Sequence, residues 1–374
     1  MSLIRHFALA LTIALVSSTT AFGQALTITD VFDREVTFDK PIERVILGDG
    51  RFLYALAPLQ KDDPFDKIVA WSDKLITSSP TLWGQFAEAF PAARDLPIIG
   101  AVADGEVATE HLLAFNADVL VLPLDAEHQA AEANVITTLG QIGVEVVFID
   151  LQEYPLENTD RSIRILGQIF GKDDAAEAFV AWRQQQFVRV TDVIAAHDPE
   201  RPVVFLDRFP GPPDPCCKSY GPANFGKLIE IAGGDNLASK FMSVSRVTLN
   251  PEQILASKPE IYIATGSDLK TERAIVRLHA GADRAAAIEA LKGTTSGPAF
   301  VGSPALESQR VHGIWHLFEA NSYDVIALQA VAKWIHPELF TDLDPEATFK
   351  ELHDLYLPFD YQPGYWVSLT DDLG

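Results

Sequence analysis

Residues 110–121 read EHLLAFNADVLV, and residues 252–263 read EQILASKPEIYI. The two stretches align without a gap: each begins with a glutamate in a helical pattern, passes an acidic residue and continues as alternating valine or isoleucine. A helix followed by a buried β-branched strand is the building unit of an α/β sheet. Any two α/β units share that order. Here, however, the two stretches also have the glutamate, the Leu-Ala pair, the acidic residue and the Val/Ile positions at identical spacing, which favours an internal duplication.

Strand patterns around these segments repeat in two halves. In the first half, short β-branched runs at 45–47, 67–70, 119–122 and 144–149 alternate with helical stretches. The order starts again near Pro202, with Val203–Leu206 as the opening strand. This alternation predicts parallel sheets with helices on both faces. We therefore expect the α/β class, with two doubly wound lobes, and a small hairpin over residues 26–38.

A helical segment lies between the halves. Asn158–Phe170 has a helical pattern that Gly171 breaks, and Asp173 and Asp174 can begin a second helix that reaches about His197. Those roughly 25 residues would extend about 37 Å. A long backbone α-helix of this kind predicts lobes that rock slightly and do not clamp, with the ligand cleft between them. The predicted divisions are a signal peptide (1–23), an N-terminal lobe (24–157), linking helices (158–199) and a C-terminal lobe with its tail (200–374).

The first residues predict export. Arg5 precedes an apolar run over 7–16, and Ala21-Phe22-Gly23 is a small-x-small cleavage pattern. About ten apolar residues cannot cross about 30 Å of hydrocarbon, so a membrane anchor is the weaker alternative. No cysteine lies at the cleavage position, which argues against a lipid anchor. We expect the mature protein in the periplasm, an oxidising compartment.

Composition excludes several classes of function. The chain of 374 residues has 52 acidic and 29 basic side chains and a net charge of −23, which argues against a nucleic-acid partner. An apolar fraction of 48% excludes a disordered chain. Two cysteines are too few for a disulfide scaffold or a four-cysteine zinc site.

The chain also lacks common catalytic motifs. It has no Gly-x-Ser-x-Gly elbow, no His-Glu-x-x-His and no P-loop. We expect a binding protein and not an enzyme; the alternatives are an exported metallohydrolase or chelatase, and a non-transport binding or sensory protein of the same fold. His111 and His128 lie on predicted helices away from strand ends, which argues against a zinc-binding relative.

The signal, the two lobes and the helical bridge together resemble a class III periplasmic substrate-binding protein of an ABC importer. The resemblance runs from TDVFDREVTF (29–38) to WHLFEANSYDVIALQAVAKWIHPELF (315–340), and its most specific parts are EHLLAFNADVLVL and EQILASKPEIYIA. It implies that Glu110 and Glu252 meet arginines of the membrane permease. Each carboxylate also favours a helix N-terminus by itself.

Two further motifs bear on the ligand. CCKSYGPANFG (216–226) and GIWHLFEANSYD (313–324) resemble an iron-uptake subgroup of that family. The resemblance implies a transported iron chelate, most of all a ferric siderophore, with haem or cobalamin as the alternative. It implies no permanent cofactor, an ABC permease as protein partner, and we expect a monomer.

In open α/β sheets, ligands bind at the carboxyl ends of the strands. In the first half, Gly48-Asp49-Gly50-Arg51 follows the first strand, and a helix N-terminus with Arg51 would attract an anion. A plain turn is the alternative. Trp71 follows the next strand and could lie in the cleft or the core, and Trp83 is similarly ambiguous.

In the second half, a long proline-rich loop follows Leu206 and contains Arg208, Cys216, Cys217 and Tyr220. Adjacent α-carbons lie about 3.8 Å apart, shorter than disulfides prefer, so a bridge between these neighbours would be strained. It is nevertheless the only intramolecular pairing available, and free thiols or intermolecular bonds are the alternatives. Tyr220 could bind the chelate or Fe(III), or be structural.

The last predicted strand, at 311–314, leads to Trp315 and His316. We expect both to contact the ligand at the strand exit. His316 and Tyr220 are candidate metal ligands, although a lone buried histidine is more often structural.

Overall fold

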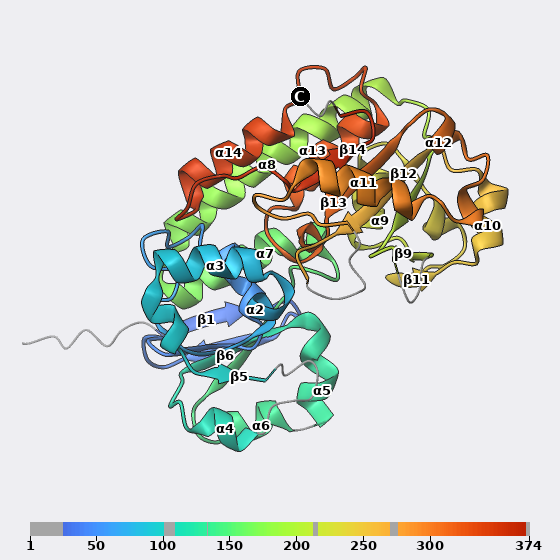
Figure 1. Cartoon of the computed structure of the whole chain (residues 1–374). Helices are drawn as coiled ribbons and strands as arrows, with labels where there is room; N and C mark the ends of the chain where they lie inside the picture. Colours follow the sequence, from blue (N-terminus) through green and yellow to red (C-terminus); the bar gives the residue numbers. More distant parts are fainter. Residues whose placement is uncertain (1–24, 101–108, 133, 212–215, 270–275, 372–374) are drawn as a thin grey trace, which may run out of the picture.

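The computed structural model describes residues 25–100, 109–132, 134–211, 216–269 and 276–371. The predicted signal peptide lies outside these residues. Two α/β lobes are joined by a pair of helices (Figure 1). Within the described ranges, no helix is both long and apolar enough to cross a bilayer.

The N-terminal lobe contains a five-stranded parallel sheet in the order β5-β4-β3-β6-β7. Its strands are β3 (Val45–Leu47), β4 (Ile68–Ser72), β5 (Ile98–Ile99), β6 (Val119–Pro123) and β7 (Glu145–Ile149). The predicted hairpin is confirmed as antiparallel β1 (Leu26–Thr29) and β2 (Glu35–Phe38). From β3 the chain adds β4 and β5 on one side and then β6 and β7 on the other, so the strand order reverses between β3 and β6.

Six described α-helices accompany this sheet: α1 (Leu53–Leu56), α2 (Lys74–Ser78), α3 (Pro80–Ala89), α4 (Thr109–Leu113), α5 (Glu127–Glu132) and α6 (Val135–Gly140). The strands are buried apart from a few positions at their ends. This explains their continuous β-branched character, since helices cover both faces of a parallel sheet.

The C-terminal lobe repeats the plan with the order β10-β8-β12-β13-β14. Its strands are β8 (Val203–Asp207), β10 (Asp235–Asn236), β12 (Ile261–Gly266), β13 (Val311–Trp315) and β14 (Trp366–Ser368). Only β14 is antiparallel to its neighbour. A separate two-stranded ribbon pairs β9 (Lys218–Tyr220) with β11 (Arg246–Thr248). Here the strand order reverses between β8 and β12.

The helices of this lobe are α9 (Asn224–Ile231), α10 (Pro251–Ser257), α11 (Arg284–Thr294), α12 (Pro304–Glu307), α13 (Asp324–Ile335) and α14 (Pro345–Tyr356). The pairs α4–β6 and α10–β12 correspond to the two aligned sequence segments. Each is a helix joined to a buried strand by a short turn.

The linking segment consists of α7 (Pro155–Phe170) and α8 (Asp173–His197). The bounds of α8 are those predicted, because two acids lie in its first turn and Asp198 ends it in a left-handed conformation. α7 begins three residues earlier than predicted, since Pro155 occupies its first turn, where proline needs no hydrogen-bond partner.

The C-terminal segment makes a second connection between the lobes, which the sequence did not indicate. α14 lies beside α8 on the outside of the molecule (Figure 1), with Trp182 Nε1 donating to Glu351 Oε1 at 3.2 Å. Beyond α14, the Phe359 ring lies 5.0 Å from Phe86 of α3 in the N-terminal lobe. Lys61 Nζ also donates to the Asp354 carbonyl at 2.8 Å. The lobes are therefore held by α8 and by this returning segment.

The returning segment gives a stability prediction. We expect Phe359→Ala to lower the free energy of unfolding by about 2 kcal/mol, less than a fully buried ring because Phe359 is half-buried. Urea unfolding would measure the loss. Phe241→Ala, at a ring that is 40% exposed, is the matched control and should cost well under half as much. Equal losses in the two variants would contradict the role of the Phe86 contact.

Candidate functional site

The carboxyl ends of the two sheets face each other across the junction between the lobes. In each lobe the strand order reverses at the strand that carries the first predicted loop, β3 or β8. A reversal of strand order opens a crevice at the carboxyl ends, where ligands of α/β proteins bind. The loops after β3, β6 and β7 therefore meet those after β8, β12 and β13. We call this region the interlobe cleft.

Arg51 lies at the start of the cleft, on a short 3-10 turn (Gly50–Phe52). The Asp49 side chain accepts the Arg51 backbone N–H at 2.8 Å and also pairs with its guanidinium, with Oδ2 2.6 Å from Nη2. Burial would lower the pKa of Arg51, but the Asp49 carboxylate raises it above its usual range. The predicted anion-attracting loop thus already contains its own carboxylate.

Glycine at position 50 is required by close packing. A Cβ there would come within 2.4 Å of the Ser72 carbonyl and 2.9 Å of the Trp71 ring. The Gly50 N–H donates to Ser72 Oγ at 3.0 Å. This contact holds the Arg51 turn down against the end of β4.

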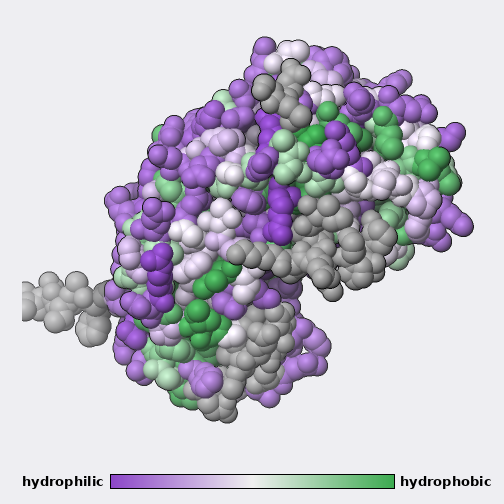
Figure 2. All heavy atoms as spheres, in the orientation of Figure 1, coloured by the Kyte–Doolittle hydropathy of each residue, from purple (hydrophilic) through white to green (hydrophobic). Residues whose placement is uncertain are grey.

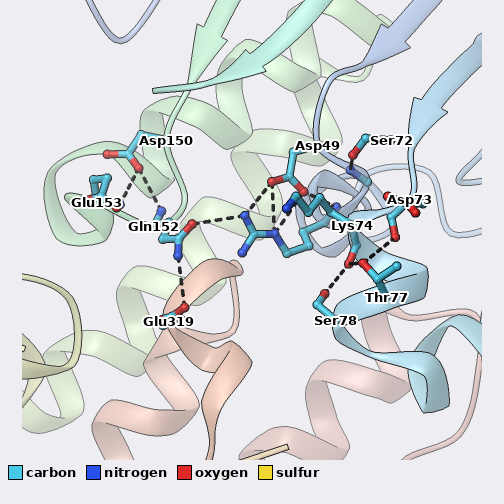
Figure 3. Close-up of polar contacts among 12 residues, drawn as sticks. Asp49, Ser72, Asp73, Lys74, Thr77, Ser78, Asp150, Gln152, Glu153 and Glu319 are labelled. Atoms are coloured by element: carbon cyan, nitrogen blue, oxygen red, sulfur yellow. Dashed lines mark hydrogen bonds and ion pairs between the residues drawn. The ribbon is translucent and has the colours of Figure 1, made fainter. Parts of the chain in front are cut away.

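Gln152 connects the two lobes (Figure 3). Its Oε1 accepts from Arg51 Nη2 at 3.2 Å, and its Nε2 donates to Glu319 Oε1 at 3.1 Å. The turn that presents Gln152 is shaped by Asp150, whose carboxylate accepts the backbone N–H groups of residues 152, 153 and 154. A continuous polar chain therefore runs from Asp49 through Arg51 and Gln152 to Glu319.

His316 continues this chain into the C-terminal lobe. Its Nε2 lies 3.0 Å from Glu319 Oε1, and its Nδ1 lies 3.0 Å from Thr265 Oγ1. Because an ionised Glu319 can only accept, Nε2–H donates to it, and Nδ1 of the neutral ring then accepts from the Thr265 hydroxyl. Burial, followed by nearby arginines, holds the pKa of His316 well below its usual value.

Arg208 and Tyr220 form the neighbouring wall. The Arg208 guanidinium lies 4.6 Å from the centre of the Tyr220 ring, a cation–π contact. Burial lowers the pKa of Arg208. Among the described residues, neither Arg208 Nε nor the Tyr220 hydroxyl has a hydrogen-bond partner. Both atoms are buried, and Tyr220 is 0% exposed, so a ligand would reach them only after the loop around them moves.

Cys216 and Cys217 are joined by a disulfide at the start of β9. Cys217 is fully buried and Cys216 is half-buried. The ribbon that follows carries Arg246, whose Nη2 lies 2.7 Å from Glu153 Oε1 of the N-terminal lobe. The ribbon therefore makes a second polar contact across the cleft.

Two predicted ligand contacts are buried among other aromatic rings, which corrects the expectation of a ligand-facing surface. Trp71 is 0% exposed, and its ring lies 5.1 Å from Trp83 and 5.9 Å from Phe65 in the core of the N-terminal lobe. Trp315 is 2% exposed and packs at 5.9 Å against Tyr54 of the opposite lobe. Both rings point inward because the ends of their strands are covered by packed turns.

The expectation that His316 contacts the ligand or a metal is also corrected. Both of its ring nitrogens are occupied by Thr265 and Glu319, so neither is free for a metal in this conformation. Within the described parts of the chain, no three His, Cys, Asp or Glu side chains come together as a metal site.

Several cleft residues were missed from the sequence: Asp49, Gln152, Glu153, Asn224, Arg246 and Glu319. Asp49 lies inside the quoted Gly-rich loop, and Glu319 is three residues beyond His316 in the quoted motif. Gln152 and Glu153 follow the predicted strand 144–149, so the strand-end rule applied to that strand would have found them. No sequence feature near Arg246 marks it as a cleft residue.

Around Gln152, the described side chains leave little open space. The cavity lined by Asp49, Arg51, Gln152 and Glu153 has a volume of about 20 Å³, room for one water molecule. A larger cavity of about 620 Å³ lies between the end of α8 and α9, but its Lys227 is paired with Glu230 and its Arg201 bonds backbone carbonyls. That cavity lies near the amino end of β8, away from the strand ends that bind ligands.

The predicted docking glutamates lie in the first turns of α4 and α10. Glu252 is exposed, and Asn250 caps its helix by accepting the Glu252 N–H at 2.9 Å. Each helix is joined to the following strand by a short turn, so it runs antiparallel to that strand. Its N-terminus therefore lies at the same edge of the sheet as the cleft.

This architecture, two α/β lobes around a cleft with a helical connection, defines a bilobal solute-binding protein. A family model described as "Periplasmic binding protein" matches residues 77–314. The chain belongs to this family of periplasmic binding proteins. No protein of curated function matches the sequence.

Solved structures agree with this assignment. The TroA-like periplasmic binding protein FepB from Veillonella parvula is 27% identical, covers 92% of this chain and 99% of its own, and has a TM-score of 0.84. CeuE from Helicobacter pylori with Ni(II) bound is 16% identical over 90% of this chain and 97% of its own, with a TM-score of 0.66. A periplasmic haem-binding protein from Pseudomonas aeruginosa is 19% identical over 79% and 94%, with a TM-score of 0.54. The last two share the fold.

Glu319 gives a prediction about pH. Burial raises its pKa to about 7, against the opposing effects of Arg208 and Arg51, from a usual value of 4.5. Between pH 4.5 and pH 7, Glu319 is protonated in the folded protein and ionised in the unfolded chain. The contribution of this proton to the free energy of unfolding is therefore full below pH 4.5 and is lost as the pH rises through 7. Glu319→Gln removes this dependence.

We therefore expect the free energy of unfolding of Glu319→Gln, relative to wild type, to rise by about 3 kcal/mol between pH 4.5 and pH 8. Urea unfolding over a pH series would measure the difference. Glu307→Gln, at an exposed position, is the control and should follow the wild-type profile. Parallel profiles for wild type and Glu319→Gln would refute the raised pKa.

Proposed function

We propose that this protein is an exported solute-binding protein that captures an iron chelate of the ferric siderophore type and delivers it to an ABC-transporter permease. The observation that carries the proposal is the set of arginines in the cleft. Arg51, Arg208 and Arg246 all act on His316, although the chain as a whole has a charge of −23. Arg51 and Arg246 are paired with Asp49 and Glu153, but Arg208 has no acidic side chain within ion-pair distance among the described residues, and an unpaired guanidinium favours an anionic ligand.

The ligand chemistry follows from the donor groups. A siderophore supplies its own oxygen ligands to iron, so the protein needs to recognise negative oxygens and flat rings and does not need a cluster of metal ligands. A guanidinium presents a planar set of N–H donors to such oxygens. Arg208 has an Nε without a partner among the described residues, and the Tyr220 ring holds its guanidinium in place by a cation–π contact.

The other predicted site residues take supporting roles in this proposal. Arg51 contributes charge from the N-terminal lobe, and Cys216 and Cys217 shape the loop beside Tyr220. Trp315 and His316 pack behind the side chains of Arg208 and Tyr220, and Trp71 packs against the turn that carries Arg51. Direct ligation of iron by Tyr220 or His316 would require each to leave its present packing.

Haem is the second candidate ligand, because structures titled as haem-binding proteins from Pseudomonas aeruginosa and Roseiflexus share the fold. Cobalamin rests on the sequence resemblance alone. Neither catalysis nor a permanent cofactor is part of the proposal. We place the protein in the periplasm as a monomer, after removal of residues 1–23.

The binding proposal predicts the effects of two substitutions. Arg208→Gln and Tyr220→Phe should each weaken the binding of a ferric tris-catecholate by about 1–3 kcal/mol, because each removes a polar contact in a desolvated site. Quenching of tryptophan fluorescence would measure affinity. Arg94→Gln, at an exposed position, is the control.

Wild-type protein that binds neither a ferric tris-catecholate, a ferric tris-hydroxamate, haem nor cyanocobalamin would refute the proposed ligand class. Turnover of any of these compounds would instead support the metallohydrolase or chelatase alternative.

The docking proposal predicts a separation of binding from transport. Glu110→Lys and Glu252→Lys should leave chelate affinity intact and abolish iron uptake, because reversed charge repels the permease arginines. Uptake of ⁵⁵Fe-labelled chelate by cells carrying the transporter would measure this, with Glu307→Lys as control. Loss of affinity in either purified variant would place that glutamate in the ligand site and not at the permease.

A further inference from the structure

Glu319 is a buried carboxylate at the contact between the two lobes. It lies on the 3-10 turn His316–Ala320 and is 5% exposed. Its Oε1 accepts from Gln152 Nε2 at 3.1 Å and from His316 Nε2 at 3.0 Å. Its Oε2 has no hydrogen-bond partner among the described residues. A buried carboxylate with one free oxygen is costly, so its retention suggests a role.

The charges around Glu319 come from both lobes. Arg51 faces it from the N-terminal lobe and Arg208 from the loop after β8, while Glu153 adds a second negative charge. Arg246 is paired with Glu153, and Arg51 is paired with Asp49. Arg208 has no acidic side chain within ion-pair distance among the described residues, so Glu319 is the carboxylate that balances it at longer range.

The Glu319 turn is also tied to the N-terminal lobe through its backbone. Asn224 Nδ2 donates both to the Gln152 carbonyl at 2.6 Å and to the Glu319 carbonyl at 2.9 Å. Gln152 therefore contacts Glu319 directly through its side chain and indirectly through Asn224. Figure 3 shows Gln152 reaching toward Glu319 from the opposite lobe.

We propose that Glu319 is an internal anion that holds the unloaded cleft closed through Gln152, and that a negatively charged group of the ligand takes its place beside Arg208 and Arg51. The ligand part of this inference rests on the proposed function; the closing contact does not.

Three consequences follow from this arrangement. The cavity beside Gln152, about 20 Å³, has room for one water molecule, so a ligand group that binds Arg51 at this point must displace the Gln152–Glu319 contact. The cost of breaking it lowers the affinity for every ligand. An anionic ligand replaces the electrostatic interactions of Glu319 with Arg208 and Arg51, whereas a neutral or cationic ligand does not. Glu319 therefore makes binding depend on the charge of the ligand.

The ligand part is tested with Glu319→Gln, which keeps the oxygen acceptor and removes the charge. At pH 8, we expect the variant to bind trianionic ferric enterobactin about tenfold more tightly than wild type, since both arginines lose a competing anion. Affinity for cationic ferrioxamine B should be unchanged or weaker. The control Glu307→Gln should match wild type for both. Unchanged or weaker binding of ferric enterobactin by Glu319→Gln would overturn the replacement of Glu319 by ligand.

The closing contact is tested without any ligand. Gln152→Ala removes the side chain that joins Arg51 to Glu319 and leaves every charge in place. Hydrogen exchange measured by mass spectrometry should accelerate severalfold in peptides covering residues 49–56 and 314–322 of the unloaded protein. Gln141→Ala, at an exposed position of the N-terminal lobe, is the matched control. Unchanged exchange in Gln152→Ala would overturn the closing contact.

The two experiments together show which of the two proposals fails. Accelerated exchange together with no binding of either chelate by wild type or Glu319→Gln would retain the closing contact and overturn the siderophore assignment and the replacement step. Binding of a chelate with unchanged exchange would retain the proposed function and overturn the closing contact.

Discussion

The buried guanidinium of Arg183 ties the linking helices to the part of the C-terminal lobe that faces the cleft. From α8, its Nη1 lies 2.5 Å from Asp324 Oδ1 of α13, and its Nε lies 3.1 Å from Asp160 Oδ1 of α7. The same Nη1 donates to the Ser322 carbonyl. Removing one partner from a buried ion pair costs about 3–5 kcal/mol, so these groups keep their places. Ser322 in turn donates to the Tyr54 carbonyl of the N-terminal lobe at 2.8 Å. Residues 322–324 are thereby fixed to both lobes, and Glu319 lies three residues before Ser322.

This anchor and the C-terminal return limit how far the two lobes can move relative to one another. α8 packs against α7 and against α13 and α9 of the C-terminal lobe, and the Phe86–Phe359 contact adds a second attachment. Large hinge motion would have to disrupt the buried ion pair or this aromatic contact. Rocking about these attachments is enough to separate Gln152 from Glu319, because a hydrogen bond is lost within about 1 Å of movement. A rigid frame with a breakable polar contact suits a protein that must hold and then release its cargo.

The charge distribution gives the cleft its chemistry. Hydrophilic residues cover most of the face seen in Figure 2, in keeping with the acidic composition. Inside the cleft, burial and then the charges of three arginines hold the pKa of His316 well below its usual value. Two of them, Arg51 and Arg246, are paired with Asp49 and Glu153. Arg208 keeps an unpartnered Nε within the described structure, which makes it the strongest candidate for a ligand contact among the predicted residues.

The sequence by itself determined the α/β class, the bounds of α8, the hairpin and the strand ends that carry Arg51, Arg208 and His316. These features depend on periodicity, capping and turn residues within a few positions of one another. Only the tertiary structure decided that Trp71 and Trp315 are buried, that Gln152 joins Arg51 to Glu319, and that the C-terminal segment returns to α3. The Arg51–Gln152 and Gln152–Glu319 partners are 101 and 167 residues apart in the chain. No local pattern encodes such contacts, because whether a ring is buried or a charge is paired depends on which surface the other lobe brings against it.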